Sequence, residues 1–111
     1  GRKSAAIRPG IHGEADEAYF RDWSRQARAR TRLPILLVGG MRSRSVMEDV
    51  LASGDADLIS MCRPLICEPD FPRRLRAGQQ THSSCVSGDR CWPKREGEGI
   101  SCKCPHDPQP G

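Results

Sequence analysis

The fold is decided by residues 34–64, which read PILLVGGMRSRSVMEDVLASGDADLISMCRP. Residues 35–38 are a continuous apolar run, and residues 57–61 form a second short run centred on Leu and Ile. Runs of this length are typical of strands buried on both faces, as in parallel sheets. The residues between them carry one helical pattern, which is long enough for a right-handed crossover between parallel strands. Residues 34–61 are therefore predicted to form one βαβ unit.

The crossover helix has recognisable start and stop signals. Ser45 is followed three residues later by Glu48, the pattern of a capping box, so the helix is expected to begin at Ser45. Gly54 follows the last turn, where glycine commonly ends a helix. The apolar side of the helix consists of Val46, Met47, Val50 and Leu51.

A second helix is predicted upstream, over residues 15–31. Phe20, Trp23 and Ala27 recur at spacings of three and four, so they form one apolar stripe. The opposite side of this helix is rich in arginine, with Arg21, Arg25 and Arg28. The pattern predicts that the apolar stripe packs on the protein.

A short third helix is predicted after the second strand, which Arg63–Pro64 is expected to end. Asp70 is placed to cap this helix, and Pro72 falls in its first turn, where proline is tolerated. Gly78 is expected to close it.

These patterns divide the chain into three regions. Residues 1–13 are expected to be a loop, and residues 14–78 contain the predicted strands and helices. Residues 79–111 are rich in Cys, Gly, Pro and Ser without apolar periodicity, so an irregular tail is expected.

Composition restricts the classes of protein to which the chain can belong. The 18 basic and 14 acidic residues are mixed along the chain rather than clustered, so no nucleic-acid partner is expected. No apolar run reaches the roughly 18 residues of a membrane span. Residues 1–4 are not followed by the apolar segment of a signal peptide, so a reducing cytosol is the expected compartment for the six cysteines.

The chemistry-bearing residues follow the two predicted strands. Gly39 and Gly40 come after the first strand, and Cys62 and Arg63 after the second. Because ligands of α/β folds bind at the carboxyl ends of strands, these residues are candidates for one site. Glycine lets backbone N–H groups approach a phosphate, and arginine offers a fork-shaped cation. The alternatives are an ordinary Gly-Gly turn and a solvated arginine.

The amino-acid sequences of these segments resemble those of a known family. Residues 33–42 (LPILLVGGMR), 56–66 (ADLISMCRPLI) and 68–70 (EPD), with residues 17–20 (EAYF) upstream, are similar to the old yellow enzyme family. This is the NADH:flavin oxidoreductase group that includes 2,4-dienoyl-CoA reductase. The resemblance extends over roughly residues 14–104.

The resemblance implies a fold and a cofactor. The chain would be the C-terminal portion, the last two βα units, of a TIM (β/α)8 barrel, a fold that needs about 250 residues. Gly39, Gly40, Cys62 and Arg63 would hold the phosphate of FMN. Cys62 stands where many members have glycine, which matters only if that position needs a positive φ.

The resemblance also implies a reaction. NAD(P)H would reduce FMN, and the flavin would pass hydride to a small-molecule acceptor such as an activated alkene. The substrate-binding and proton-donating residues of the family lie on earlier strands, so no catalytic residue is named in this chain. Two strands out of eight leave sheet edges open, so the isolated chain is expected to bind FMN weakly or not at all.

The tail contains candidate metal ligands. Cys85, Cys91 and Cys102 resemble the iron–sulfur segment of the dienoyl-CoA reductase and trimethylamine dehydrogenase branch, with Gly88 in place of the middle cysteine and Cys104 as an extra thiol. Four thiolates hold a [4Fe–4S] cluster. Zinc, or no metal, remain the alternatives, since the cysteine spacing does not follow the paired pattern of zinc knuckles.

Two other functions remain open from the residues alone. One is a small Cys-rich metal-binding module, for zinc or an Fe–S cluster, on an α/β scaffold. The other is a binding domain for a different phosphorylated ligand, because many barrels share this kind of site.

Overall fold

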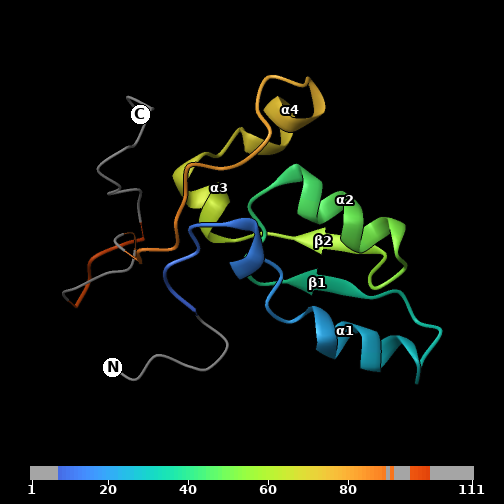
Figure 1. Ribbon diagram of the computed structural model, residues 1–111. Coiled ribbons are helices and arrows are strands. Elements are labelled where there is room, and N and C mark those ends of the chain that lie inside the picture. The colour runs from blue at the N-terminus through green and yellow to red at the C-terminus, as the bar shows by residue number, and fades with distance from the viewer. Residues whose placement is uncertain (1–7, 90, 92–95, 101–111) are drawn as a thin grey trace.

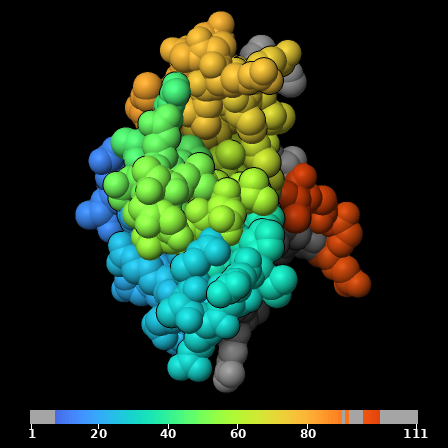
Figure 2. Space-filling model, turned by 90° about the vertical axis from the view of Figure 1, so that its right-hand side faces the viewer, coloured from blue at the N-terminus to red at the C-terminus, as the bar shows by residue number. Residues whose placement is uncertain are grey.

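The computed structural model describes residues 8–89, 91 and 96–100. The elements in chain order are the 3-10 turn η1 (Glu14–Asp16), α1 (Arg21–Arg28), β1 (Leu36–Val38), α2 (Arg44–Ala52), β2 (Leu58–Ser60), α3 (Arg63–Cys67) and α4 (Phe71–Arg76). In space-filling form α2 (green) lies between the residues around α1 and β1 (blue to cyan) and α4 (gold) (Figure 2). Among the described residues no helix is long and apolar enough to cross a membrane.

The two strands form a parallel sheet that α2 connects (Figure 1). Leu36 pairs with Leu58, and Val38 with Ser60. This arrangement confirms the predicted βαβ unit and the α/β class, with strands slightly shorter than the apolar runs. Both strands run in the same direction, so the residues that follow them emerge at one edge of the sheet.

Only one face of the sheet is covered by the described residues. Leu37 points into the core and is 5% exposed, whereas Leu36 and Val38 are 60% and 48% exposed. Leu58, the partner of Leu36, is also exposed. The alternation follows from the two-residue period of a strand. The prediction that both faces are buried is therefore wrong for the described part of the chain.

A small core lies on the covered face of the sheet. Val50 of α2 and Phe71 of α4 are completely buried there, and each contributes about 1.5–3 kcal/mol through its buried side chain. The members of this core are Ala18, Leu37, Met41, Met47, Val50, Ala56 and Phe71. The core thus joins α2 and α4 to the strand β1.

Helix α2 begins two residues earlier than predicted. Its N-cap is Ser43 rather than Ser45, and the predicted capping box with Glu48 is not formed. Ser45 lies inside the first turn, where its hydroxyl donates to Glu14, and Glu48 instead pairs with Arg44 at 2.8 Å. A buried carboxylate from another segment binds the N-cap residue Ser43, as described below.

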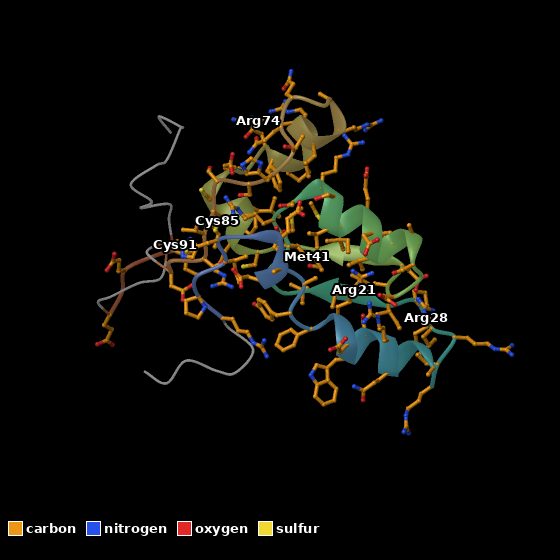
Figure 3. All side chains as sticks on the ribbon, in the orientation of Figure 1. Arg21, Arg28, Met41, Arg74, Cys85 and Cys91 are labelled. Carbon is orange, nitrogen blue, oxygen red and sulfur yellow. The ribbon has the colours of Figure 1, made fainter. Side chains whose placement is uncertain are left out.

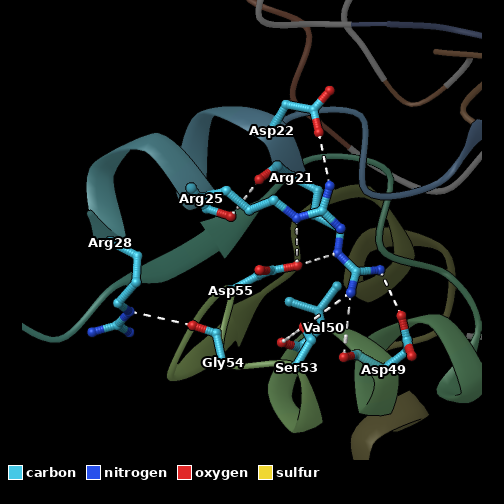
Figure 4. Close-up of polar contacts among 10 residues, drawn as sticks. Arg21, Asp22, Arg25, Arg28, Asp49, Val50, Ser53, Gly54 and Asp55 are labelled. Atoms are coloured by element: carbon cyan, nitrogen blue, oxygen red, sulfur yellow. Dashed lines mark hydrogen bonds and ion pairs between the residues drawn. The ribbon is translucent and has the colours of Figure 1, made fainter. Parts of the chain in front are cut away.

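Helix α1 is shorter than predicted and turned the other way. Ala18, at φ +50, separates the helix from η1, so residues 15–31 do not form one helix. Trp23, expected to pack on the protein, is 66% exposed. The arginine side faces the protein instead, because acidic residues around the end of α2 offer Arg21 and Arg25 partners (Figure 4).

The region after β2 contains a helix that the sequence analysis missed. The strand ends at Ser60, before Arg63 and Pro64 are reached, and these two residues instead begin α3. Proline in the first turn was the available signal, because proline is favoured at that position. Helix α4 follows Asp70 as predicted, but the Asp70 carboxylate accepts from the Arg74 side chain at 2.9 Å rather than from the backbone.

Candidate functional site

One cavity opens at the carboxyl ends of the two strands. It has a volume of about 290 Å³, and all four predicted residues, Gly39, Gly40, Cys62 and Arg63, line it. Two segments outside the βαβ unit complete its wall, one around Ile11 and Tyr19 and the other around Cys85. The structure therefore brings the glycine-bearing and arginine-bearing strand ends together in one place.

The two glycines are required by their backbone conformation and by an aromatic neighbour. Gly39 has φ +120 and Gly40 has φ +69, which side chains rarely adopt. A Cβ atom on either glycine would approach ring carbons of Tyr19, to 2.9 Å at Gly39 and 2.8 Å at Gly40. The Tyr19 ring thus lies directly on the turn that follows β1.

Arg63 is held by three groups at the edge of the cavity. Its Nη1 donates to Asp89 Oδ1 at 2.7 Å, while Nη2 donates to the Arg8 carbonyl at 3.0 Å and to the Tyr19 hydroxyl at 3.4 Å. The Arg63 and Asp89 side chains are only 10% and 8% exposed. The sequence analysis proposed Arg63 as an anion ligand but missed Asp89, its buried partner.

The position of Cys62 does not require glycine. Its φ is −124, which any L-residue adopts. The Cys62 residue is exposed and its backbone caps the start of α3. The cysteine in place of the family's glycine therefore leaves the backbone of this turn intact.

The N-terminal segment and the tail are tied together over the cavity. Ile11 N–H donates to the Val86 carbonyl at 3.0 Å, and Gly10 N–H donates to the Ser87 carbonyl at 3.3 Å. The Arg8 guanidinium lies over the Tyr19 ring, 4.8 Å from its centroid, within the range of a cation–π contact. These contacts place residues from both ends of the described chain beside the strand tips.

A buried glutamate fixes the loop that follows β1. Glu17 accepts hydrogen bonds from the Arg42 N–H at 2.8 Å, the Ser43 N–H at 2.5 Å and the Ser43 hydroxyl at 2.6 Å. These groups stand at the N-terminus of α2, where a carboxylate is stabilised by the helix dipole. Glu17 therefore anchors Ser43, the N-cap residue of α2, and sets the path from Gly40 into the helix.

A second buried glutamate anchors the segment that leads to Cys85. Glu68 is 1% exposed and accepts from Gln80 Nε2 at 2.6 Å, the Ser83 hydroxyl at 2.8 Å and the Ser84 N–H at 2.7 Å. Burial raises the pKa of Glu68, but these hydrogen bonds outweigh burial, and the net effect lowers it. The ionised carboxylate thus holds residues 80–84 against α3.

The predicted metal ligands are only partly described. Cys85 and Cys91 are both buried and lie at the same end of the molecule (Figure 3), whereas Cys102 lies outside the described residues. Burial raises the pKa of the Cys91 thiol, and the nearby Cys85 and Asp89 raise it further. Within residues 8–89, 91 and 96–100, no three His, Cys, Asp or Glu side chains are grouped to hold a metal ion.

Comparison with known proteins identifies a family. The family model described as NADH:flavin oxidoreductase / NADH oxidase matches residues 7–82. An NADH-dependent flavin oxidoreductase, iliE, of Neonectria sp. (strain DH2) is 35% identical over 60 residues, which are 53% of this chain and 8% of that protein. A 4,4'-dithiodibutanoate disulfide reductase of Rhodococcus erythropolis is 27% identical over 78 residues, 70% of this chain and 19% of that protein.

A dimethylamine dehydrogenase of Hyphomicrobium sp. (strain x) is 28% identical over 88 residues, 78% of this chain and 12% of that protein. The chain thus spans less than a fifth of the length of these relatives. Their names support the family rather than the dienoyl-CoA reductase branch in particular. Because the family model covers well over half of the residues, the chain belongs to the NADH:flavin oxidoreductase / NADH oxidase family.

Proposed function

We propose that the chain contributes the FMN-phosphate site of an NAD(P)H-dependent flavin oxidoreductase. The observation that carries this proposal is the single cavity that Gly39, Gly40, Cys62 and Arg63 line at the ends of two parallel strands. In barrels, phosphate sites are frequently built from the loops after the last two strands.

The residues at the cavity suit a phosphate group. Gly39 and Gly40 put no side chain between the backbone and an approaching anion, and Arg63 brings a guanidinium to the same wall. Cys62 has a negative φ and lines the same cavity. When bound, FMN would supply hydride transfer between NAD(P)H and a small-molecule acceptor.

The protein around the cavity would fix the position of this group. Glu17 holds the loop after Gly40, and Tyr19 packs against both glycines, so the turn is rigid before any ligand arrives. A rigid site costs less ordering entropy on binding. The chain would therefore hold and orient the flavin, while residues elsewhere in the protein would act on the substrate.

We also propose that the rest of a (β/α)8 barrel covers the exposed face of the sheet. Leu36, Val38 and Leu58 are apolar and exposed on that face, and both outer strand edges are unpaired among the described residues. Residues 14–78 would then be the last two βα units. The isolated chain, lacking the other units, would bind FMN weakly.

The experiment compares flavins with and without a phosphate. Arg63→Met in the full-length protein should weaken FMN binding roughly 10- to 100-fold, because a hydrogen bond to a charged group contributes about 1.5–3 kcal/mol. Riboflavin, which lacks the phosphate, should bind the variant almost as it binds the wild type. Arg76→Met, an exposed arginine of α4, is the matched control. Equal weakening of FMN and riboflavin by Arg63→Met would remove the phosphate assignment.

The alternative of a Cys-rich metal module is not favoured. The family match extends over residues 7–82, which form the α/β part and end before Cys85. The cavity is likewise built mainly from the strand ends. A [4Fe–4S] cluster on Cys85, Cys91 and Cys102 stays a separate prediction, which iron and sulfide analysis of anaerobically purified full-length protein would test.

A further inference from the structure

The arginine proposed to bind phosphate already has a buried counter-ion. Arg63 Nη1 lies 2.7 Å from Asp89 Oδ1, and the two side chains are 10% and 8% exposed. Charges this deeply placed are screened little by salt and interact strongly. The electrostatic character of the cavity therefore depends on Asp89 as much as on Arg63.

Asp89 is brought to this position by the backbone of the tail. Ser87 and Asp89 have φ +58 and +61, so the chain turns sharply in the left-handed region just before the ion pair. The Ser87 carbonyl accepts from Gly10, which ties the turn to the N-terminal segment. The Asp89 carboxylate is thus positioned by a hydrogen-bonded turn and is not on a freely moving surface side chain.

Both terminal nitrogens of Arg63 donate within the protein. Nη1 bonds to Asp89, and Nη2 bonds to the Arg8 carbonyl and the Tyr19 hydroxyl. A phosphate that binds this arginine must share the guanidinium with these acceptors or replace one of them. Asp89 is the acceptor with a negative charge, so a phosphate dianion beside it would meet like-charge repulsion in a poorly screened place.

We propose that Asp89 sets the anion specificity of the cavity by competing with phosphate for Arg63. The inference rests on the proposed function, in which Arg63 contacts the phosphate of FMN. A bound dianion has to share the guanidinium with the Asp89 carboxylate or displace it, and in both cases the carboxylate lowers the preference for phosphorylated over unphosphorylated flavin. The residue acts through Arg63 and touches no reacting atom, so its effect is on binding.

If Asp89 instead orients Arg63 toward the ligand, its removal has the opposite effect on phosphate binding. A carboxylate that orients the arginine toward the ligand would strengthen phosphate binding, and its removal would weaken it. The two roles can be separated by the ratio of the riboflavin Kd to the FMN Kd, because this ratio isolates the contribution of the phosphate. A general disturbance of the cavity changes both constants and leaves the ratio unchanged.

Asp89→Asn is the decisive variant. Asparagine tolerates the left-handed φ of this position and keeps an oxygen that can accept from Arg63, but it removes the negative charge. Titrations of the full-length protein with FMN and riboflavin should show the ratio rising on the order of tenfold, as expected when a like charge near a bound anion is removed. Asp70→Asn removes the carboxylate paired with Arg74, and neither residue lines the cavity, so this variant should leave the ratio unchanged.

The outcomes distinguish this inference from the proposed function. A ratio that stays the same or falls in Asp89→Asn overturns the inference. If Arg63→Met lowers the ratio at the same time, the phosphate site stands and only the role of Asp89 is wrong. If Arg63→Met leaves the ratio unchanged, the phosphate site itself is wrong. Asp89→Ser, which is smaller and also neutral, should reproduce the rise, and a rise in neither neutral variant rejects competition.

Discussion

Arg21 of α1 and Asp55, in the turn before β2, are joined by a hydrogen-bonded ion pair of 2.6 Å between Nε and Oδ2. Arg25 donates to the same carboxylate oxygen at 3.0 Å, and Arg21 also pairs with Asp49 at 2.7 Å (Figure 4). One carboxylate shared by two guanidinium groups fixes the rotation of α1 against the βαβ unit. Helix α1 is therefore attached by charge, with its tryptophan turned outward.

Removing this carboxylate should loosen α1. Asp55→Ala is expected to lower the free energy of unfolding by about 1–3 kcal/mol at neutral pH, because two arginines lose a partly buried acceptor. Asp22→Ala is the control, since its 3.0 Å pair with Arg25 is exposed and should contribute less than about 1 kcal/mol. Urea unfolding followed by circular dichroism measures both, and equal small losses would contradict the attachment.

The same pair predicts a dependence of stability on pH. Burial raises the pKa of Asp55, but hydrogen bonds from Arg21, Ser53 and Arg25 outweigh it, so the folded-state pKa lies below the ordinary value. The stabilisation is then complete above the unfolded pKa, near pH 4, and is lost as the pH falls through the folded pKa. The difference in unfolding free energy between wild type and Asp55→Ala should shrink in acid; a difference that grows in acid would have the wrong sign.

Glu17, a buried loop residue, should be costly to replace. Glu17→Ala leaves the buried Ser43 hydroxyl and two N–H groups at the start of α2 without their acceptor, which should cost about 2–4 kcal/mol. Glu48→Ala removes a carboxylate from the exposed side of the same helix, with an expected loss under about 1 kcal/mol. Similar unfolding midpoints for the two variants would show that Glu17 does not stabilise the start of α2.

The turn after β1 should tolerate no side chain. Gly40→Ala combines a left-handed φ, which costs about 1–2 kcal/mol, with a Cβ 2.8 Å from the Tyr19 ring. Gly54→Ala has a similar φ of +80 but nothing within 4 Å of its Cβ, so it measures the backbone strain alone. Gly40→Ala should be clearly the more destabilising in thermal unfolding. Equal losses would mean that the Tyr19 contact adds no cost.

The described cysteines should differ in reactivity. Cys62 is exposed, whereas Cys85 and Cys91 are buried, and burial raises the pKa of Cys91. Because the thiolate is the reactive form, iodoacetamide near pH 8 should modify Cys62 before the other two. Peptide mapping by mass spectrometry at short times provides the comparison. Earlier labelling of Cys91 than of Cys62 would contradict the burial described here.

Sequence reasoning succeeded where the signal is local. The apolar runs at residues 35–38 and 57–61, with one helix between them, are sufficient for a parallel βαβ unit, and this unit brought Gly40 and Arg63 to one cavity. Two parallel strands joined by a right-handed crossover can be arranged in few other ways. The prediction of the site's place therefore needed no knowledge of side-chain partners.

The missed features are contacts between residues far apart in the chain. Glu17 and Ser43 are separated by 26 positions, and so are Arg63 and Asp89. A capping box within residues 45–48 fits the sequence, but the helix begins at Arg44, and its N-cap Ser43 is held by a buried carboxylate from a distant segment. The predicted orientation of α1 is wrong for the same kind of reason. Its arginines pair with aspartates elsewhere in the chain, and the periodicity of one helix does not reveal such partners.

The uncovered face of the sheet affects how the chain behaves when it is prepared alone. Leu36 and Leu58 lie side by side there, next to strand edges with spare hydrogen-bonding capacity. Solutions of the separate chain should therefore turn from monomers to aggregates as concentration rises. The substitution Leu36→Lys should improve the solubility of the separate chain. The same substitution within a complete barrel should harm folding, because it would bury a charge.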